Sequence, residues 1–87
     1  MIWLTVRYFA AARAAAGVDA EELALPLPGT WTVDDVLREL ADRHGPALAK
    51  VLGACSFLLD EVAVRSRDTV VPRSGAVLDV LPPFAGG

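Results

Sequence analysis

Residues 32–44, TVDDVLRELADRH, form the most strongly patterned segment of the chain. Thr32 suits the N-cap of a helix, and Asp34 and Asp35 fall in the first turn, where the helix dipole favours negative charge. Four apolar residues recur at the spacing of one helical face: Val33, Val36, Leu37 and Leu40. The segment therefore predicts an amphipathic helix, which Gly45 and Pro46 end.

Four segments on either side of this helix predict strands. Residues 2–9, IWLTVRYF, are rich in β-branched and aromatic residues. Residues 20–25 and 76–81 are shorter runs of the same kind, and residues 55–64 predict a strand pair that turns at Asp60-Glu61. In the first strand the better core face takes every second position: Ile2, Leu4, Val6 and Tyr8.

Two short helices complete the predicted order. Alanines surround Arg13 and are followed by Gly17, which suits a left-handed helix cap. Residues 46–53 open on a proline, which the first turn of a helix tolerates. The order of elements predicts an α+β fold in which one main helix covers one face of a small mixed sheet.

The composition limits the classes of function. The chain has 87 residues, enough for one domain, and its 54% hydrophobic content is high enough to suggest an apolar surface patch for a partner. The net charge of −3, with scattered basic residues, disfavours nucleic-acid binding. No apolar run approaches the ~20 residues of a membrane span, and residues 1–9 lack the basic region of a signal peptide. We expect a cytoplasmic protein.

A conventional active site is not predicted. His44, the only histidine, falls in the last turn of a helix, where a structural role is expected. Because Cys55 is the only cysteine, the chain has no disulfide framework, and Cys55 is expected to be a buried, inert thiol. No metal-ligand spacing and no phosphate-binding loop occur, so no metal is expected. The adjacent acidic pairs are expected to be solvated surface residues: Glu21-Glu22, Asp34-Asp35 and Asp60-Glu61.

The last residues, LPPFAGG at 81–87, carry the strongest functional signal. Pro82-Pro83 ends the last strand and favours a stiff, extended exit, after which four residues can reach at most about 14 Å. Gly86 and Gly87 have no side chains, so the terminal carboxylate can enter a narrow channel. We therefore expect a domain over residues 1–81 and a flexible Gly-Gly tail over residues 82–87.

The α-carboxylate of Gly87 is the expected reacting group. A carboxylate is ionised at neutral pH and resists nucleophiles, so it must first be activated, for instance as a mixed anhydride with AMP. A sulfur or amine nucleophile can then displace the activating group. The protein would act as a carrier that one enzyme loads and another unloads.

Three stretches resemble the MoaD/ThiS family of ubiquitin-like sulfur carriers, especially its molybdopterin synthase small-subunit branch: residues 1–17, 31–40 and 74–87. The resemblance covers essentially the whole chain, and the final PP-x-x-GG is its most specific part. It implies a β-grasp fold whose first and last strands are parallel and central. In the family the strand turn usually carries Asn at the position of Asp60.

The resemblance also implies a reaction cycle. An E1-like enzyme uses ATP to adenylate Gly87, and a sulfur donor protein converts the adenylate to a thiocarboxylate. The large subunit of molybdopterin synthase accepts the tail, and the sulfur passes to a cyclic pterin precursor during molybdenum cofactor biosynthesis. The chain would bind no cofactor permanently, and by itself it would not be an enzyme.

The expected partner surface lies at the exit of the tail. Strand alternation directs Leu78 and Val80 towards the helix and leaves Val77, Asp79 and Leu81 on the open side. Phe9 and Leu81, with Trp3 as a further candidate, are expected to contact the partner. The residues expected to insert into the partner are Pro83, Phe84, Ala85 and Gly86.

Three other functions fit the residues. The chain could carry sulfur for thiamin, cysteine or another metabolite. It could be a ubiquitin-like modifier joined to lysines through Gly87. It could also be a small scaffold, for which removing Gly87 would change nothing.

Overall fold

Strands and helices follow the predicted order along the chain. The structure is a computed structural model, and it describes residues 1–83. Its elements are β1 (Ile2–Tyr8), α1 (Ala10–Ala16), β2 (Ala20–Leu25), α2 (Val33–His44), α3 (Pro46–Leu52), β3 (Ser56–Leu59), β4 (Val62–Ala63) and β5 (Ala76–Leu81). Residues 65–75, between β4 and β5, form an irregular crossing, which contributes one isolated bridge from Val70 to Thr32.

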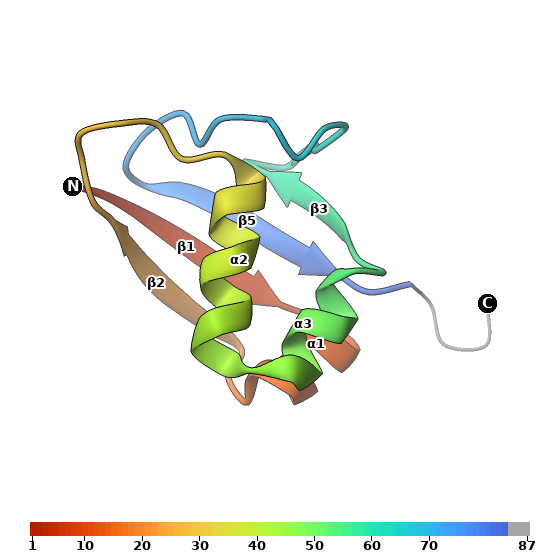
Figure 1. Ribbon diagram of the computed structural model, residues 1–87. Coiled ribbons are helices and arrows are strands. Elements are labelled where there is room, and N and C mark those ends of the chain that lie inside the picture. Colours follow the sequence, from red (N-terminus) through yellow and green to blue (C-terminus); the bar gives the residue numbers. More distant parts are fainter. Residues whose placement is uncertain (84–87) are drawn as a thin grey trace.

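The first and last strands pair in parallel at the centre of the sheet. Across residues 1–83 the sheet has five strands in the order β2-β1-β5-β3-β4, and all neighbours except β1 and β5 are antiparallel (Figure 1). In the central pair Leu4 lies opposite Ala76 and Tyr8 opposite Val80. The parallel, central placement of these strands is therefore confirmed.

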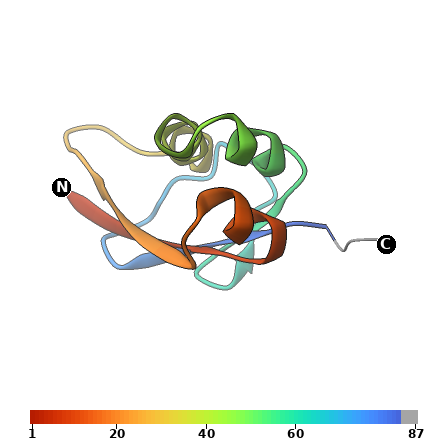
Figure 2. The ribbon, with the colours of Figure 1, turned by 90° about the horizontal axis from the view of Figure 1, so that it is seen from below.

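The core lies between one face of the sheet and α2. Leu4 and Val6 of β1 are fully buried, as are Leu78 and Val80 of β5. The four predicted apolar residues of α2 are all buried, and α2 and α3 lie on the same side of the sheet (Figure 2). Burying one such aliphatic side chain contributes roughly 1.5–3 kcal/mol. The predicted faces of the central strands and of the main helix are confirmed.

The main helix begins with a capping box. Thr32 Oγ1 accepts a hydrogen bond from the Asp35 amide at 3.1 Å, and the Asp35 carboxylate accepts one from the Thr32 amide at 3.0 Å. Thr32 is therefore the N-cap, as predicted. Asp35 was expected to be a solvated surface residue, but it is half-buried and its carboxylate completes the capping box. Gly45 ends the helix at φ 92°, and its amide donates to the Ala41 carbonyl at 2.8 Å.

The hairpin between β3 and β4 turns at Asp60 and Glu61, as predicted. Both residues have positive φ, 49° for Asp60 and 69° for Glu61. Leu59 and Val62 pair across the two-residue loop, so the turn has the backbone of a type I′ hairpin. Asp60 also anchors the turn to β5, because its carboxylate accepts from the Val77 amide at 2.9 Å.

Candidate functional site at the end of the central strands

The base of the tail is fixed by both central strands. Because β1 and β5 run parallel, their carboxyl ends lie at the same edge of the molecule (Figure 1). Phe9 follows β1, and its amide donates to the carbonyl of Val80 at 3.3 Å. Pro82 and Pro83 follow β5 directly and cannot donate hydrogen bonds to a neighbouring strand. The chain therefore leaves the sheet from its central pair of strands.

Apolar side chains are exposed around this exit. Phe9 is 41% exposed, Leu81 and Pro82 are half-buried, and Pro83 is exposed. Trp3 is also exposed, but it lies near the other end of β1, about 20 Å from Phe9 at ~3.3 Å per residue. The structure thus brings Phe9 and Leu81 to the tail exit and places Trp3 away from it. Contact of Phe9 and Leu81 with a partner stays a prediction.

The tail residues themselves lie outside the described residues. They are Phe84, Ala85, Gly86 and Gly87. Their insertion into a partner, the chemistry at Gly87 and the division of the chain after residue 81 therefore stay predictions.

An ion pair that the sequence did not predict lies on the open face of the sheet. Arg7 and Asp79 are cross-strand neighbours, and the guanidinium donates two hydrogen bonds to the carboxylate, at 2.5 and 2.8 Å. Asp79 is only 4% exposed, although it points to the predicted open side. These hydrogen bonds and the charge of Asp79 raise the pKa of Arg7, and the charge of Glu61 adds a smaller effect.

A signal for this pair was present in the sequence. Arg7 and Asp79 carry opposite charges, and each lies in a mainly apolar strand. Their contact spans 72 positions and depends on the register of two parallel strands. Only a predicted pairing of the two strands at that register would have found it.

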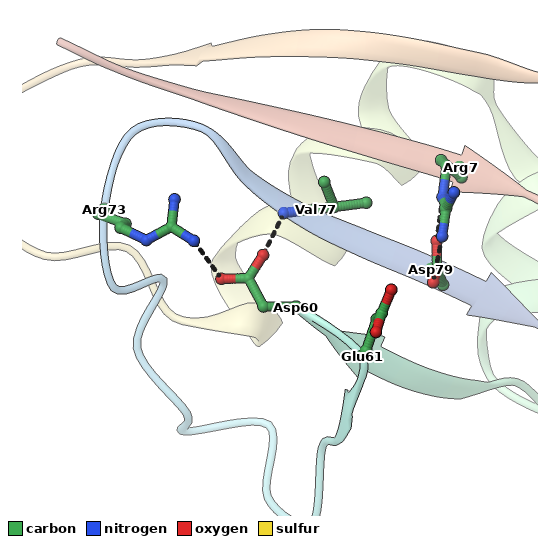
Figure 3. Close-up of a pocket in the computed structure, with 6 residues that line it drawn as sticks. All are labelled: Arg7, Asp60, Glu61, Arg73, Val77 and Asp79. Carbon is green, nitrogen blue, oxygen red and sulfur yellow. Dashed lines mark hydrogen bonds and ion pairs between the residues drawn. The ribbon is translucent and has the colours of Figure 1, made fainter.

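A hollow of about 270 Å³ adjoins the ion pair on the open face (Figure 3). It is lined by Arg7, Asp60, Glu61, Arg73, Val77 and Asp79. Arg73 donates to the second oxygen of the Asp60 carboxylate at 3.2 Å. Glu61 is exposed and makes no ion pair or side-chain hydrogen bond within residues 1–83. Among residues 1–83, the hollow thus contains two internal ion pairs and one carboxylate without a partner.

A second polar cluster joins three elements at one carboxylate. Glu21 of β2 accepts hydrogen bonds from the Tyr8 hydroxyl at 2.6 Å and from Arg43 at 3.1 Å, and it also contacts His44 Nε2. The Tyr8 and His44 rings pack edge to face at 5.9 Å. His44 therefore has the structural role that was predicted. The prediction that Glu21 is solvated is wrong, because its side chain is 14% exposed.

The cluster changes the acidity of two of its members. Burial raises the pKa of Glu21, but hydrogen bonds from Tyr8, His44 and Arg43 outweigh burial and lower its pKa overall. Burial and the adjacent Glu21 carboxylate raise the pKa of Tyr8 well above its usual value. At neutral pH the carboxylate of Glu21 is therefore ionised and the phenol of Tyr8 is neutral.

The remaining candidates for chemistry have ordinary surroundings. The Cys55 thiol donates to the Val51 carbonyl at 3.2 Å, and burial raises its pKa, so little thiolate forms at neutral pH. Among residues 1–83 no three His, Cys, Asp or Glu side chains gather as a metal site would require. The same part of the chain contains no helix with the length and apolarity to span a membrane.

The parallel central strands and the crossing helix define a β-grasp, ubiquitin-like fold, and solved structures of this class match it over nearly the whole chain. Residues 6–87 match the model of the ThiS family, and the chain belongs to that family.

Known relatives resemble the chain along its whole length. A molybdopterin synthase sulfur carrier subunit from Chlamydomonas reinhardtii is 34% identical over 84 residues, which are 97% of this chain and 98% of the relative. The structure of a putative molybdopterin converting factor, subunit 1, from Pyrococcus furiosus is 27% identical, with a TM-score of 0.74 and coverage of 97% and 100%. Small archaeal modifier protein 1 from Methanosarcina acetivorans is 26% identical, with a TM-score of 0.75 and coverage of 100% and 98%.

Proposed function

We propose that the chain is the sulfur carrier subunit of a molybdopterin synthase and that the carboxylate of Gly87 carries the sulfur. The observation that carries this proposal is the exit of the chain from the paired ends of β1 and β5 through Pro82 and Pro83, which are followed in sequence by the Gly-Gly end. The similarity to a sulfur carrier subunit over the whole chain supports it.

The proposed chemistry needs only the terminal carboxylate of this chain. An oxygen of the Gly87 carboxylate attacks the α-phosphorus of ATP on an E1-like enzyme, and pyrophosphate leaves. Hydrosulfide released by a sulfur donor then attacks the carbonyl carbon of the mixed anhydride, the bond from that carbon to the AMP oxygen breaks, and AMP leaves a thiocarboxylate behind. The large synthase subunit accepts the loaded tail, the thiocarboxylate sulfur bonds to a carbon of the pterin precursor and displaces an oxygen substituent, and water then cleaves the bond between the sulfur and the Gly87 carbonyl, which restores the carboxylate. ATP is used by the activating enzyme and is not bound by the folded domain.

Product formation in a reconstituted system tests this proposal. The full chain, the large subunit, the activating enzyme, ATP, a sulfur donor and the pterin precursor are combined, and the dithiolene product is measured. Deletion of Gly87 should abolish product, and Gly86→Ala should reduce it strongly, because a Cβ obstructs entry into a narrow channel. Full product formation by the chain that lacks Gly87 would contradict the proposal.

A pair of matched leucine substitutions tests the proposed interface. Leu81→Asp introduces a charge at the tail exit, whereas Leu27→Asp does so at an exposed leucine between β2 and α2, near the opposite end of the molecule. We expect Leu81→Asp to weaken binding of the large subunit at least tenfold and Leu27→Asp to change it less than twofold. Equal affinities for both variants would remove Leu81 from the interface.

A second candidate function is protein modification through Gly87. It is favoured by the similarity to small archaeal modifier protein 1 over the full length of the chain. In that case an amine of a lysine side chain displaces AMP and forms an isopeptide bond. Mass spectrometry of proteins purified with a tagged form of the chain distinguishes the two functions, because only modification leaves the C-terminal glycines attached to lysines.

A further inference from the structure

The charged hollow on the open face lies beside the tail exit. Asp79 precedes Leu81 by two residues on β5, so the two side chains share the open face of that strand. Phe9 follows β1 in an extended conformation, two residues after Arg7, and so lies on the same side as Arg7. The Arg7 guanidinium lies 6.0 Å from the centre of the Phe9 ring. A protein that covers Phe9 and Leu81 would therefore also reach the hollow.

The hollow has an excess of one negative charge. The residues that line it include the carboxylates Asp60, Glu61 and Asp79 and the guanidinium groups Arg7 and Arg73 (Figure 3). Asp79 is neutralised by Arg7 and Asp60 by Arg73. Three negative charges and two positive charges give a net charge of −1. The unbalanced charge is that of Glu61, which has no ion pair within the described part of the chain.

The backbone holds Glu61 in an unfavourable conformation. A φ of 69° is uncommon for any residue other than glycine, and type I′ turns strongly prefer glycine at this second position. The turn is itself fixed to β5, since the Asp60 amide donates to the Val77 carbonyl at 2.8 Å and the Asp60 carboxylate accepts from the Val77 amide at 2.9 Å. The turn therefore holds a glutamate beside the hollow where glycine would be the more stable choice.

From this charge and its position we propose that Glu61 receives a lysine or arginine side chain of the large synthase subunit when that subunit takes up the tail. The inference rests on the proposed function, which supplies the partner. The Arg7–Asp79 pair lines the hollow beneath the incoming side chain, and the carboxylate of Glu61 accepts its hydrogen bonds. The contact selects partners that present a basic residue beside the channel that admits the tail.

An exposed carboxylate of this kind acts mainly on association. Ion pairs at the rim of an interface change the association rate and its salt dependence more than they change the dissociation rate. Removing the charge should slow association only about threefold, whereas reversing it should slow association about tenfold or more. Both effects should fade at 1 M salt, where the screening length is about 3 Å.

The chain contains a matched control for this test. Glu22 is an exposed glutamate on the same open face, in β2, opposite Thr5 of β1. Glu22→Gln and Glu22→Lys make the same changes in net charge as Glu61→Gln and Glu61→Lys. Association of the full chain with the large subunit is measured at 0.1 M and 1 M salt, and thermal unfolding of each variant establishes that it folds.

Each outcome of the test decides between defined alternatives. We expect Glu61→Lys to slow association about tenfold at 0.1 M salt, Glu22→Lys to change it less than twofold, and the gap to close at 1 M salt. Equal effects of the two lysine variants, or a gap that persists at 1 M salt, would overturn the role of Glu61 but leave the sulfur-carrier function intact. If the chain with its original sequence does not bind the large subunit at all, both the role of Glu61 and the proposed function are overturned.

Discussion

At the scale of single residues, one carboxylate holds three elements together. Glu21 joins Tyr8 at the end of β1 to Arg43 and His44 at the end of α2. These hydrogen bonds favour the ionised form of Glu21, and they lower its pKa despite burial. A group whose pKa is lower in the folded state than in the unfolded state stabilises the fold above its unfolded pKa. That stabilisation is lost as the pH falls through the folded pKa.

Glu21→Gln should therefore destabilise the protein in a pH-dependent way. At pH 7 the loss of charge-assisted hydrogen bonds should lower the free energy of unfolding by about 1–2 kcal/mol. The unperturbed pKa is 4.5, so the difference from the original chain should shrink as the pH falls below that value. Denaturant unfolding at pH 7, 5 and 3 measures this difference. The control is Glu22→Gln at the exposed neighbouring residue, which should change the free energy of unfolding by less than about 0.5 kcal/mol at any pH. A Glu21→Gln effect of the same size at all three pH values would contradict the stabilising role of the ionised Glu21.

At the scale of elements, the capping box decides where α2 begins. The hydroxyl of Thr32 and the carboxylate of Asp35 each accept a hydrogen bond from the other residue's amide. The same residues lead directly into the buried stripe that starts at Val33. The cap therefore fixes the first turn of α2, and the spacing of the apolar residues from Val33 to Leu40 determines which face of the helix meets the sheet.

Thr32→Ala should lower the free energy of unfolding by about 1 kcal/mol, because an amide in the first turn loses its partner. Thr30→Ala is a matched control, since Thr30 is exposed and its side chain makes no hydrogen bond within residues 1–83. Chemical denaturation of both variants measures the difference. Equal stabilities of the two variants would mean that the capping box does not stabilise the helix.

The β3–β4 turn should show a conflict between stability and binding. Glu61→Gly removes an L side chain from a residue with φ 69° and should raise the free energy of unfolding by up to about 1 kcal/mol. The same change in a regular strand, Glu22→Gly, should lower it by about 0.5–1 kcal/mol. Thermal unfolding of both variants shows whether Glu61→Gly raises stability and Glu22→Gly lowers it. A destabilised Glu61→Gly variant would contradict the view that this turn sacrifices stability to place a charge.

At the scale of the whole molecule, local sequence patterns predicted the helices and strands. The polar clusters on the surface depend on contacts between residues far apart in the sequence. The caps and apolar spacing of α2 predicted its face, and the alternation in β1 and β5 predicted the buried sides of both strands. These signals depend on neighbours within a few residues. The burial of Asp79 beneath Arg7 and the enclosure of Glu21 by His44 join residues 72 and 23 positions apart, so no local pattern contains them.

The sequence predicted part of the candidate site: it placed Phe9 and Leu81 at the tail exit but did not predict the charged hollow beside them. Phe9 and Leu81 were expected at the tail exit, and the structure places them there because the parallel strands bring their carboxyl ends together. Trp3 was grouped with them by its apolar character, but its position near the start of β1 separates it from the exit. The hollow beside Glu61 requires the β3–β4 turn to fold back onto β5, which only the assembled sheet shows.

The intact mass of the chain tests the central claim most directly. The protein is incubated with ATP, an E1-like activating enzyme and a sulfur donor, and its mass is compared with that of a chain that lacks Gly87. We expect a shift equal to the replacement of one oxygen by sulfur, seen only when Gly87 is present. An unchanged mass with an activating enzyme that loads another carrier in the same experiment would contradict the claim that this chain carries sulfur at its C-terminus.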